Sequence, residues 1–310
     1  MNALVISGGG SKGAFAGGVA EHLLKHDKKE YDLFVGTSTG SLLIPFLALG
    51  DIERIKRLYT TIEQSDIFTV CPFKVKKKDG KVKIGINHFG IIKQFIRRQK
   101  TLGDSNNLRK LIKENFTRAD FEKIKALNKE IVVTVANLTT EQVEYKSSND
   151  YSYEDFCGWI WASSNMVPLM SLYKKDGCEY ADGGFGNLIP LQHAISKGAT
   201  TIDAIVLRLE ESAYNNPPLQ NALDIFARTS EFMLNQIAND DLIISQLQAA
   251  TNNVDINFYF INRLLTTHSY IFDKEEMAIW WREGLDLLKT REHKSHVIKV
   301  KPNDNATAML

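Results

Sequence analysis

The chain has 310 residues, of which 44% are hydrophobic and 24% are charged. This composition supports one large hydrophobic core or two modest ones, and it excludes a disordered or collagen-like chain. Lys and Arg number 38 against 37 for Asp and Glu, which leaves a net charge of +1. A charge so close to zero creates no overall field that attracts nucleic acid or anionic lipid, so such a partner would need a local basic patch.

The chain carries no pattern typical of a membrane span or a secretory signal. The longest strictly apolar stretch, Leu42–Leu49, is far shorter than the ~20 residues of a spanning helix. The first residues lack the positive n-region of a signal peptide. Three cysteines, Cys71, Cys157 and Cys178, are scattered and odd in number, as is typical of reduced thiols. We therefore expect a cytoplasmic protein.

Strand-like runs alternate with helical patterns through the first half of the chain. The expected strands are Ala3–Ile6, Leu33–Val35 and the buried Ile131–Ala136, with Gln142–Lys146 as an antiparallel neighbour of the last. Helices are expected over residues 14–26 and 42–49, and from a cap at Asp51 through Tyr59. This alternation predicts an α/β fold with a mainly parallel central sheet.

The segment Cys71–Leu102 differs in composition and is interpreted as an insertion over the sheet's edge. Lys74–Ile84 carries six lysines around Asp79-Gly80, a strong hairpin signal. Phe89–Lys100 follows as a basic amphipathic helix, with Ile91, Ile92, Phe95 and Ile96 opposite Lys93, Arg97 and Arg98. Two interpretations stay open for Lys74–Lys100: peripheral contact with an anionic membrane, or a solvated, charge-protected edge. The apolar face would cover a site as a lid or pack on the core.

The second half contains a strand at Ile202–Leu207 and another at Ile256–Ile261, between helical patterns at Leu219–Ala250 and Lys274–Lys289. No internal repeat or low-complexity linker divides the chain. We therefore expect a single domain over residues 1–310, with the insertion at about 71–102 and a helical C-terminal part at about 219–290.

A glycine loop follows the first strand. Gly8-x-Gly10-x-x-Gly13 lies between a strand and a helix, where backbone N–H groups and the helix dipole can hold a negative charge. A dinucleotide site would need an acidic residue at the end of the second strand. Asp32 lies at the wrong end of that strand, so this alternative is disfavoured.

The second strand is followed by Gly36-Thr37-Ser38-Thr39-Gly40, which fits the G-x-S-x-G pattern of a nucleophile elbow. The flanking glycines allow a sharp strand-to-helix turn that projects the serine hydroxyl from the sheet. A Ser/Thr-rich turn is the bland alternative, but the strand before the motif and the helix after it favour the elbow.

A second glycine-flanked polar residue is Asp182, which is followed by Gly183 and Gly184 at the end of a short strand. Asp-Gly-Gly also forms ordinary turns, so this triplet alone is weak. No histidine has a recognisable motif around it, although a serine nucleophile usually needs one as its base.

Together, the glycine loop, the G-x-S-x-G pentapeptide and Asp-Gly-Gly in that order resemble the patatin-like phospholipase family. Further similarities cover most of the chain and leave Cys71–Leu102 least matched; they are Ala14, Val19, Ala162-Ser163-Ser164, Met166-Val167-Pro168, Asn187, Pro190, Gly198, Phe272-Asp273 and Gly284. The resemblance implies a patatin-like, three-layer α/β/α fold and a serine acyl hydrolase that cleaves the carboxylic esters of lipids, of phospholipase A or lysophospholipase type.

The resemblance also implies the roles of individual residues. Ser38 would be the nucleophile and Asp182 the general base, with the backbone N–H groups of Gly9 and Gly10 as the oxyanion hole. Gly8, Gly13, Gly36, Gly40, Gly183 and Gly184 would shape the three motifs. No cofactor and no metal are implied. Lys12 replaces an arginine of plant members, and Met166 and Leu169 depart from the family's usual residues near the acyl site, which leaves chain-length preference open.

Two other functions remain as alternatives. One is a conventional Ser-His-Asp esterase with a base such as His268, and the other is a non-catalytic lipid-binding module. His22 and His26 have a metal-compatible spacing, but no third ligand is evident.

Overall fold

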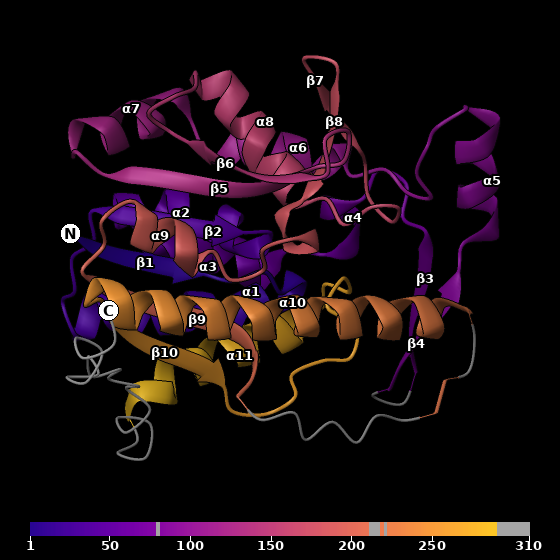
Figure 1. The fold of residues 1–310 in the computed structure, drawn as a ribbon. Helices are drawn as coiled ribbons and strands as arrows, with labels where there is room; N and C mark the ends of the chain where they lie inside the picture. The colour runs from indigo at the N-terminus through magenta and orange to yellow at the C-terminus, as the bar shows by residue number, and fades with distance from the viewer. Residues whose placement is uncertain (79–80, 211–217, 220–221, 290–310) are drawn as a thin grey trace, which may run out of the picture.

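The centre of the molecule is a β-sheet with helices on both faces (Figure 1). The computed structural model describes residues 1–78, 81–210, 218–219 and 222–289. Within these residues the strands of the sheet run in the order β10-β9-β1-β2-β5-β8-β7, and β6 also pairs with β5. Their bounds are β1 Asn2–Ile6, β2 Leu33–Thr37, β5 Glu130–Asn137, β6 Gln142–Ser147, β7 Tyr173–Lys175, β8 Cys178–Asp182, β9 Thr201–Leu209 and β10 Asp255–Ile261.

The pairing of the strands confirms a mainly parallel sheet. β10, β9, β1, β2 and β5 are parallel neighbours, whereas β6, β7 and β8 extend the sheet with antiparallel pairs. The predicted antiparallel pairing of β6 with β5 is confirmed. Because the parallel strands begin at one edge, their carboxyl ends meet at the other, and the chain leaves β1 and β2 there through the glycine loop and the G-x-S-x-G motif.

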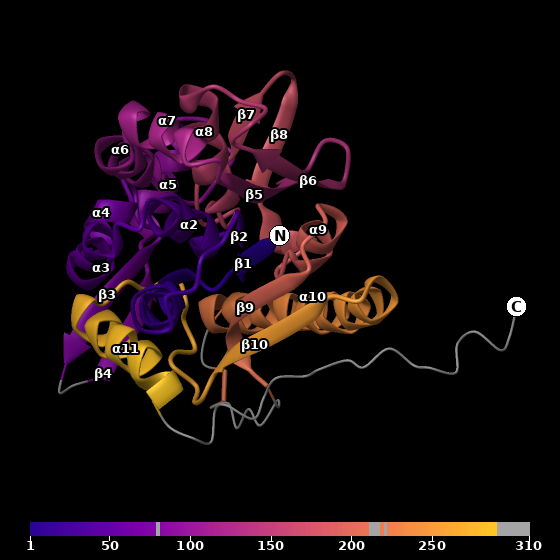
Figure 2. The same cartoon turned by 90° about the vertical axis from the view of Figure 1, so that its left-hand side faces the viewer.

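Alternate residues of the central strands belong to two separate hydrophobic cores, one on each face of the sheet, which is why the fold has three layers. In β1, Leu4 and Ile6 point into one core, while Ala3 and Val5 point into the other. Helices α9 and α10 lie on one side of the strands and α3 and α11 on the other (Figure 2). The helix bounds are α1 Gly13–Glu21, α2 Thr39–Leu49, α3 Ile52–Thr61, α4 Gln64–Ile67, α5 His88–Ile96, α6 Asn106–Asn115, α7 Arg118–Ala126, α8 Tyr153–Ser163, α9 Leu191–Ser196, α10 Ala222–Asn252 and α11 Lys274–Asp286.

The inserted segment forms a separate hairpin and a short helix. Strands β3 (Phe73–Lys78) and β4 (Lys81–Ile86) pair antiparallel, while the turn expected at Asp79-Gly80 lies outside the described residues. The helix is shorter than predicted, because α5 ends at Ile96 and leaves Arg97–Lys100 outside it. Its buried positions are Gly90 and Gln94, so most of the predicted apolar face is not packed on the core.

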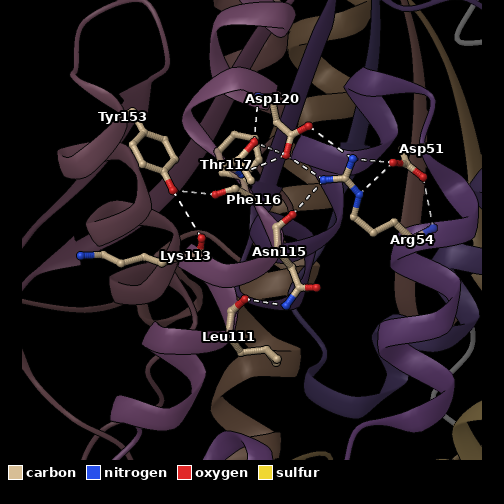
Figure 3. Close-up of polar contacts among 9 residues, drawn as sticks. All are labelled: Asp51, Arg54, Leu111, Lys113, Asn115, Phe116, Thr117, Asp120 and Tyr153. Atoms are coloured by element: carbon tan, nitrogen blue, oxygen red, sulfur yellow. Dashed lines mark hydrogen bonds and ion pairs between the residues drawn. The ribbon is translucent and has the colours of Figure 1, made fainter.

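Arg54 connects three helices on one side of the sheet (Figure 3). Its guanidinium donates to Asp51 in the turn before α3, to the carbonyl of Asn115 at the end of α6, and to Asp120 in α7. Burial alone would raise the pKa of Asp120, but the hydrogen bonds from Arg54 and Thr117 lower it overall, so the carboxylate stays charged and paired. Helices α6 and α7, which sequence patterns did not predict, are thereby fixed against α3.

Candidate active site

Ser38 occupies a strained turn between β2 and α2. Its φ of 56° is positive although it is not a glycine, a conformation that costs free energy and is found mostly at functional sites. Gly40 is required beside it, because a Cβ there would lie 2.3 Å from the carbonyl oxygen of Ile6. The turn is held by serines of α8 and its end: Ser163 Oγ accepts the Ser38 N–H at 3.0 Å, and Ser164 donates to the Ser38 carbonyl at 3.3 Å.

Asp182 is the last residue of β8 and lies at the same pocket as Ser38. It is 5% exposed, and its Oδ1 accepts the Gly184 N–H at 2.8 Å. Burial raises the pKa of Asp182 to about 6, although the hydrogen bonds from Ser38 and Gly184 favour the charged form and limit the rise. A carboxylate with this pKa is a stronger base than one in water and is still mostly ionised at neutral pH.

The glycine loop forms the next wall of the same site. Two backbone N–H groups of the loop already have acceptors. The Gly8 N–H donates to the carbonyl oxygen of Leu188, and the Ser11 N–H donates to the carbonyl oxygen of Ser269. Gly9 and Gly10, between them, line the pocket that contains Ser38 and Asp182. Gly10 has a φ of 57°, and a Cβ there would lie 2.1 Å from the Ser269 carbonyl, so no larger residue fits. Next to the loop, the buried Lys12 pairs with Glu231 of α10 at 3.3 Å.

One short segment, Asn187–Ile189, contacts all three motifs. The carbonyl oxygen of Asn187 accepts a hydrogen bond from the Thr37 hydroxyl in the G-x-S-x-G motif. The Asn187 N–H donates to the carbonyl oxygen of Gly183, the residue after Asp182. The carbonyl of Leu188 accepts from Gly8 in the glycine loop. On its other side the segment is held by Asp241 of α10, whose carboxylate accepts the Leu188 N–H, the Ile189 N–H and the Asn187 side-chain amide at 2.6 to 2.9 Å. Sequence analysis did not single out Asp241, which lies in an unremarkable helical pattern.

The pocket in front of Ser38 is predominantly apolar. Its free volume of about 80 Å³ exceeds several-fold the ~15 Å³ that one water needs. Met166 and Met170 contribute to its wall, as do the α10 residues Ala227, Ser230 and Leu234 and the C-terminal Ser269, Tyr270 and Phe272. Leu169 is buried but does not line the pocket. The contributions of α10, Ser269 and Tyr270 had no sequence signal, because they come from a helix and a loop distant in the chain.

A second apolar pocket adjoins the first. The two share Leu42, Ile67, Leu108 and Phe272 as lining residues. The second extends between α2, α3 and α6, the region where Arg54 connects the helices, and its further lining residues include Phe46, Leu58, Leu111, Ile112 and Phe116. The pocket beside Ser38 therefore lies next to a second pocket with almost exclusively hydrocarbon walls.

The described histidines lie elsewhere. His193 stacks on Tyr145, and burial, with the nearby Lys197, lowers the pKa of His193 to about 4. His22 is buried with Nδ1 at 3.0 Å from the carbonyl of Leu285. His268 immediately precedes two pocket residues, Ser269 and Tyr270, but does not itself line the pocket. Within the described part of the chain, no group of His, Cys, Asp and Glu side chains could hold a metal ion.

Comparisons with known proteins agree with this arrangement. The family model of patatin-like phospholipases matches residues 4–195, more than half of the chain. The chain belongs to the patatin-like phospholipase family. Among solved structures, VipD from Legionella pneumophila is similar with a TM-score of 0.52 and 16% identity, over 95% of this chain and 67% of that chain. The comparison with curated protein sequences finds no match. The predicted family and its three-layer fold are confirmed, and the family supports lipid acyl hydrolase activity in a broad sense.

Proposed function

We propose that this protein hydrolyses carboxylic esters of lipids with a Ser38–Asp182 dyad. The observation that carries the proposal is the juxtaposition, in one pocket, of a strained serine and a buried carboxylate of raised pKa, beside a glycine loop. Membership in the patatin-like phospholipase family supports the substrate class. Cleavage of the phospholipase A or lysophospholipase type is part of this proposal.

The reaction needs only groups present at the pocket and water. Asp182 removes the hydroxyl proton while Ser38 Oγ attacks the ester carbonyl, and the N–H groups of Gly9 and Gly10 stabilise the oxyanion. The Ser38 N–H donates to Ser163, which supports the assignment of the oxyanion donors to the glycine loop. Asp182 returns the proton to the departing alcohol, and water then hydrolyses the acyl-enzyme with Asp182 again as base.

The acyl chain is proposed to extend from Ser38 into the second apolar pocket. The residues shared by the two pockets, among them Leu42 one turn after Ser38, provide a continuous hydrocarbon surface. Burying methylene groups there would stabilise a long-chain substrate by ~0.8 kcal/mol for each CH₂. This assigns the chain-length preference to α2, α3 and α6.

The proposal includes a peripheral contact with an anionic membrane through Lys74–Lys100. In support, Lys74, Lys76, Lys93, Arg97 and Arg98 are exposed. The three cysteines are free thiols, which agrees with work at the cytoplasmic face of a membrane. In the described residues, no helix is long and apolar enough to cross a bilayer.

The decisive test is labelling with a fluorophosphonate probe, which reacts with activated serines. Ser38 should be the labelled residue, and Ser38→Ala should abolish both labelling and ester hydrolysis while circular dichroism and the melting temperature stay unchanged. Ser196→Ala, at an exposed serine outside the pocket, serves as the control and should still be labelled. Labelling that persists in Ser38→Ala, or that maps to Ser163 or Ser164, would refute the assignment.

A further inference from the structure

Helix α5 exposes the side that a core-facing helix would bury. Phe89, Ile92, Phe95 and Ile96 are 55 to 78% exposed, whereas the polar Gln94 is buried. Soluble proteins rarely leave four large apolar side chains together on a helix of nine residues. The face therefore fits a partner that accepts hydrocarbon.

The segment that carries this apolar face is rich in cations. Between Cys71 and Lys100 the chain has ten Lys and Arg residues and one acid, Asp79, a local excess of 10 − 1 = 9 positive charges. Since the whole protein has a net charge of only +1, the remaining sequence is net negative. Exposed Lys93, Arg97 and Arg98 border the apolar side chains. Hydrocarbon flanked by cations is complementary to the headgroup and acyl layers of an anionic bilayer.

The base of the insertion is attached to the walls of the active-site pocket. Phe73 of β3 stacks on Tyr270, a pocket residue, with ring centroids 5.2 Å apart. Where the chain leaves α5, the Leu102 N–H donates to the carbonyl of Pro168, between pocket residues Met166 and Met170. In Figure 1, α5 and the β3–β4 hairpin stand at the same end of the molecule, beyond the carboxyl ends of β1 and β2. A partner held by α5 is therefore held at the pocket's side of the protein.

We propose that α5 inserts Phe89, Ile92, Phe95 and Ile96 into the surface of an anionic bilayer, with the cations of the insertion on the headgroups, and so brings the pocket of Ser38 to its lipid substrate. This inference rests on the proposed lipid hydrolysis and identifies the element that inserts. The lysines attract the protein over a distance, whereas the apolar side chains retain it.

The test compares binding of two double variants to vesicles by co-sedimentation. Phe89→Ser with Phe95→Ser removes two exposed rings from α5, and Ile243→Ser with Leu247→Ser removes two exposed apolar side chains from α10 as the matched control. On vesicles of phosphatidylcholine and phosphatidylglycerol, the α5 variant should bind at least tenfold more weakly than wild type. The α10 variant should remain within twofold.

Hydrolysis of a soluble short-chain ester separates this inference from the proposed function. The α5 variant should keep that activity within twofold while it loses activity on vesicle lipid. The inference would be overturned if the α5 variant bound vesicles as tightly as wild type. It would also be overturned if wild type did not bind vesicles but still cleaved the soluble ester. Both outcomes would leave the proposed dyad intact. A concentration-dependent dimer that the α5 substitutions abolish would equally overturn the inference, because a second copy would then cover the face.

A separate observation concerns Asp241, which lies on α10 outside the residues matched by the family model. Its buried carboxylate holds Asn187–Ile189, the segment that contacts the glycine loop, the Ser38 turn and the Asp182 turn. We infer that Asp241 is a positioning residue: it fixes the oxyanion donors relative to the dyad without touching the substrate. Since a displacement of about 1 Å can cost ~10²-fold in rate, such a residue would act on kcat rather than on KM.

An exchange of two side chains tests this role. In Asp241→Asn, an amide N–H₂ would face the N–H₂ of Asn187, so kcat should fall at least tenfold with KM within threefold. Asn187→Asp combined with Asp241→Asn restores one acceptor opposite one donor and should recover kcat to within threefold of wild type. A single variant with wild-type kcat, or an exchange variant that folds to wild-type stability but recovers no kcat, would refute the inference.

Discussion

Burial of the Asp182 carboxyl group beside Ser38 costs the fold stability. The folded protein binds the Asp182 proton more tightly than the unfolded chain, because burial raises its pKa from 3.8 to about 6. The contribution of protonated Asp182 to the free energy of unfolding is therefore fully present in acid, and it is lost as the pH rises from about 4 through 6. The difference in pKa means that this contribution, about 3 kcal/mol, is absent at pH 8.

Asp182→Asn should consequently separate activity from stability. Without the base, acylation of Ser38 should fall by ~10⁴-fold, the loss seen when the acid–base machinery of a serine hydrolase is broken. The free energy of unfolding is measured by urea denaturation for the variant and for wild type. The value for the variant minus the value for wild type should increase by about 2 kcal/mol from pH 4 to pH 8. In wild type, kcat/KM should rise with pH through about 6, following ionisation of the carboxylate. A variant that retains activity would contradict the dyad.

The alternative with a histidine base is tested at single residues too. Ala replacements at His22, His88, His193 and His268, made one at a time, should each keep kcat/KM within about tenfold, ~1.4 kcal/mol of transition-state stabilisation. Substitution is required because a pH profile cannot distinguish a carboxylate titrating at about 6 from a histidine at ~6.5. A collapse at His268 in a folded protein, with Asp182→Asn mild by comparison, would favour the conventional esterase.

At the scale of elements, the two apolar pockets predict how chain length is selected. Leu111→Trp on α6 should place an indole in the second pocket and leave Ser38 untouched. The ratio of kcat/KM for long-chain over short-chain p-nitrophenyl esters should fall at least tenfold, with short-chain hydrolysis within twofold of wild type. Leu138→Trp, at a half-exposed position outside both pockets, is the control and should change neither. Equal losses for all chain lengths would place the acyl chain elsewhere.

The sequence predicted those elements in which local pattern and burial agree. Leu33–Val35 and Ile131–Ala136 are continuous β-branched or apolar runs, and both are buried strands in the structure. For α5 the amphipathic pattern predicted a helix correctly, but it could not tell which face is buried, since that depends on the partner. The three motifs of the candidate site could be found because each has glycine at fixed positions. Asp241 could not, because its role depends on a contact with Asn187, which lies far away in the chain.

For the molecule as a whole, the distribution of charge matters more than its sum. A net charge of +1 conceals a strongly basic insertion and an acidic remainder. The field of the insertion acts only within a Debye length of about 8 Å at physiological ionic strength, so the molecule would be oriented as it approaches an anionic surface. The bilayer would then meet the end of the sheet at which Ser38 and Asp182 lie.

Neutralising Lys76, Lys77, Lys78 and Lys81 to Gln should therefore weaken binding to phosphatidylglycerol-containing vesicles by about 1 kcal/mol per charge. Wild-type binding should decrease as salt is added, and the quadruple variant should show a shallower salt dependence.

The matched control neutralises Lys110, Lys113, Lys123 and Lys125 on α6 and α7, which changes the net charge by the same amount at a different place. Because that control leaves the insertion intact, its vesicle binding should stay close to wild type. Soluble ester hydrolysis should be unaltered in both variants, since the substitutions leave Ser38, Asp182 and the glycine loop in place. If the two variants weaken vesicle binding equally, net charge rather than the insertion governs the attraction, and Lys76–Lys81 return to the role of a solvated, charge-protected edge.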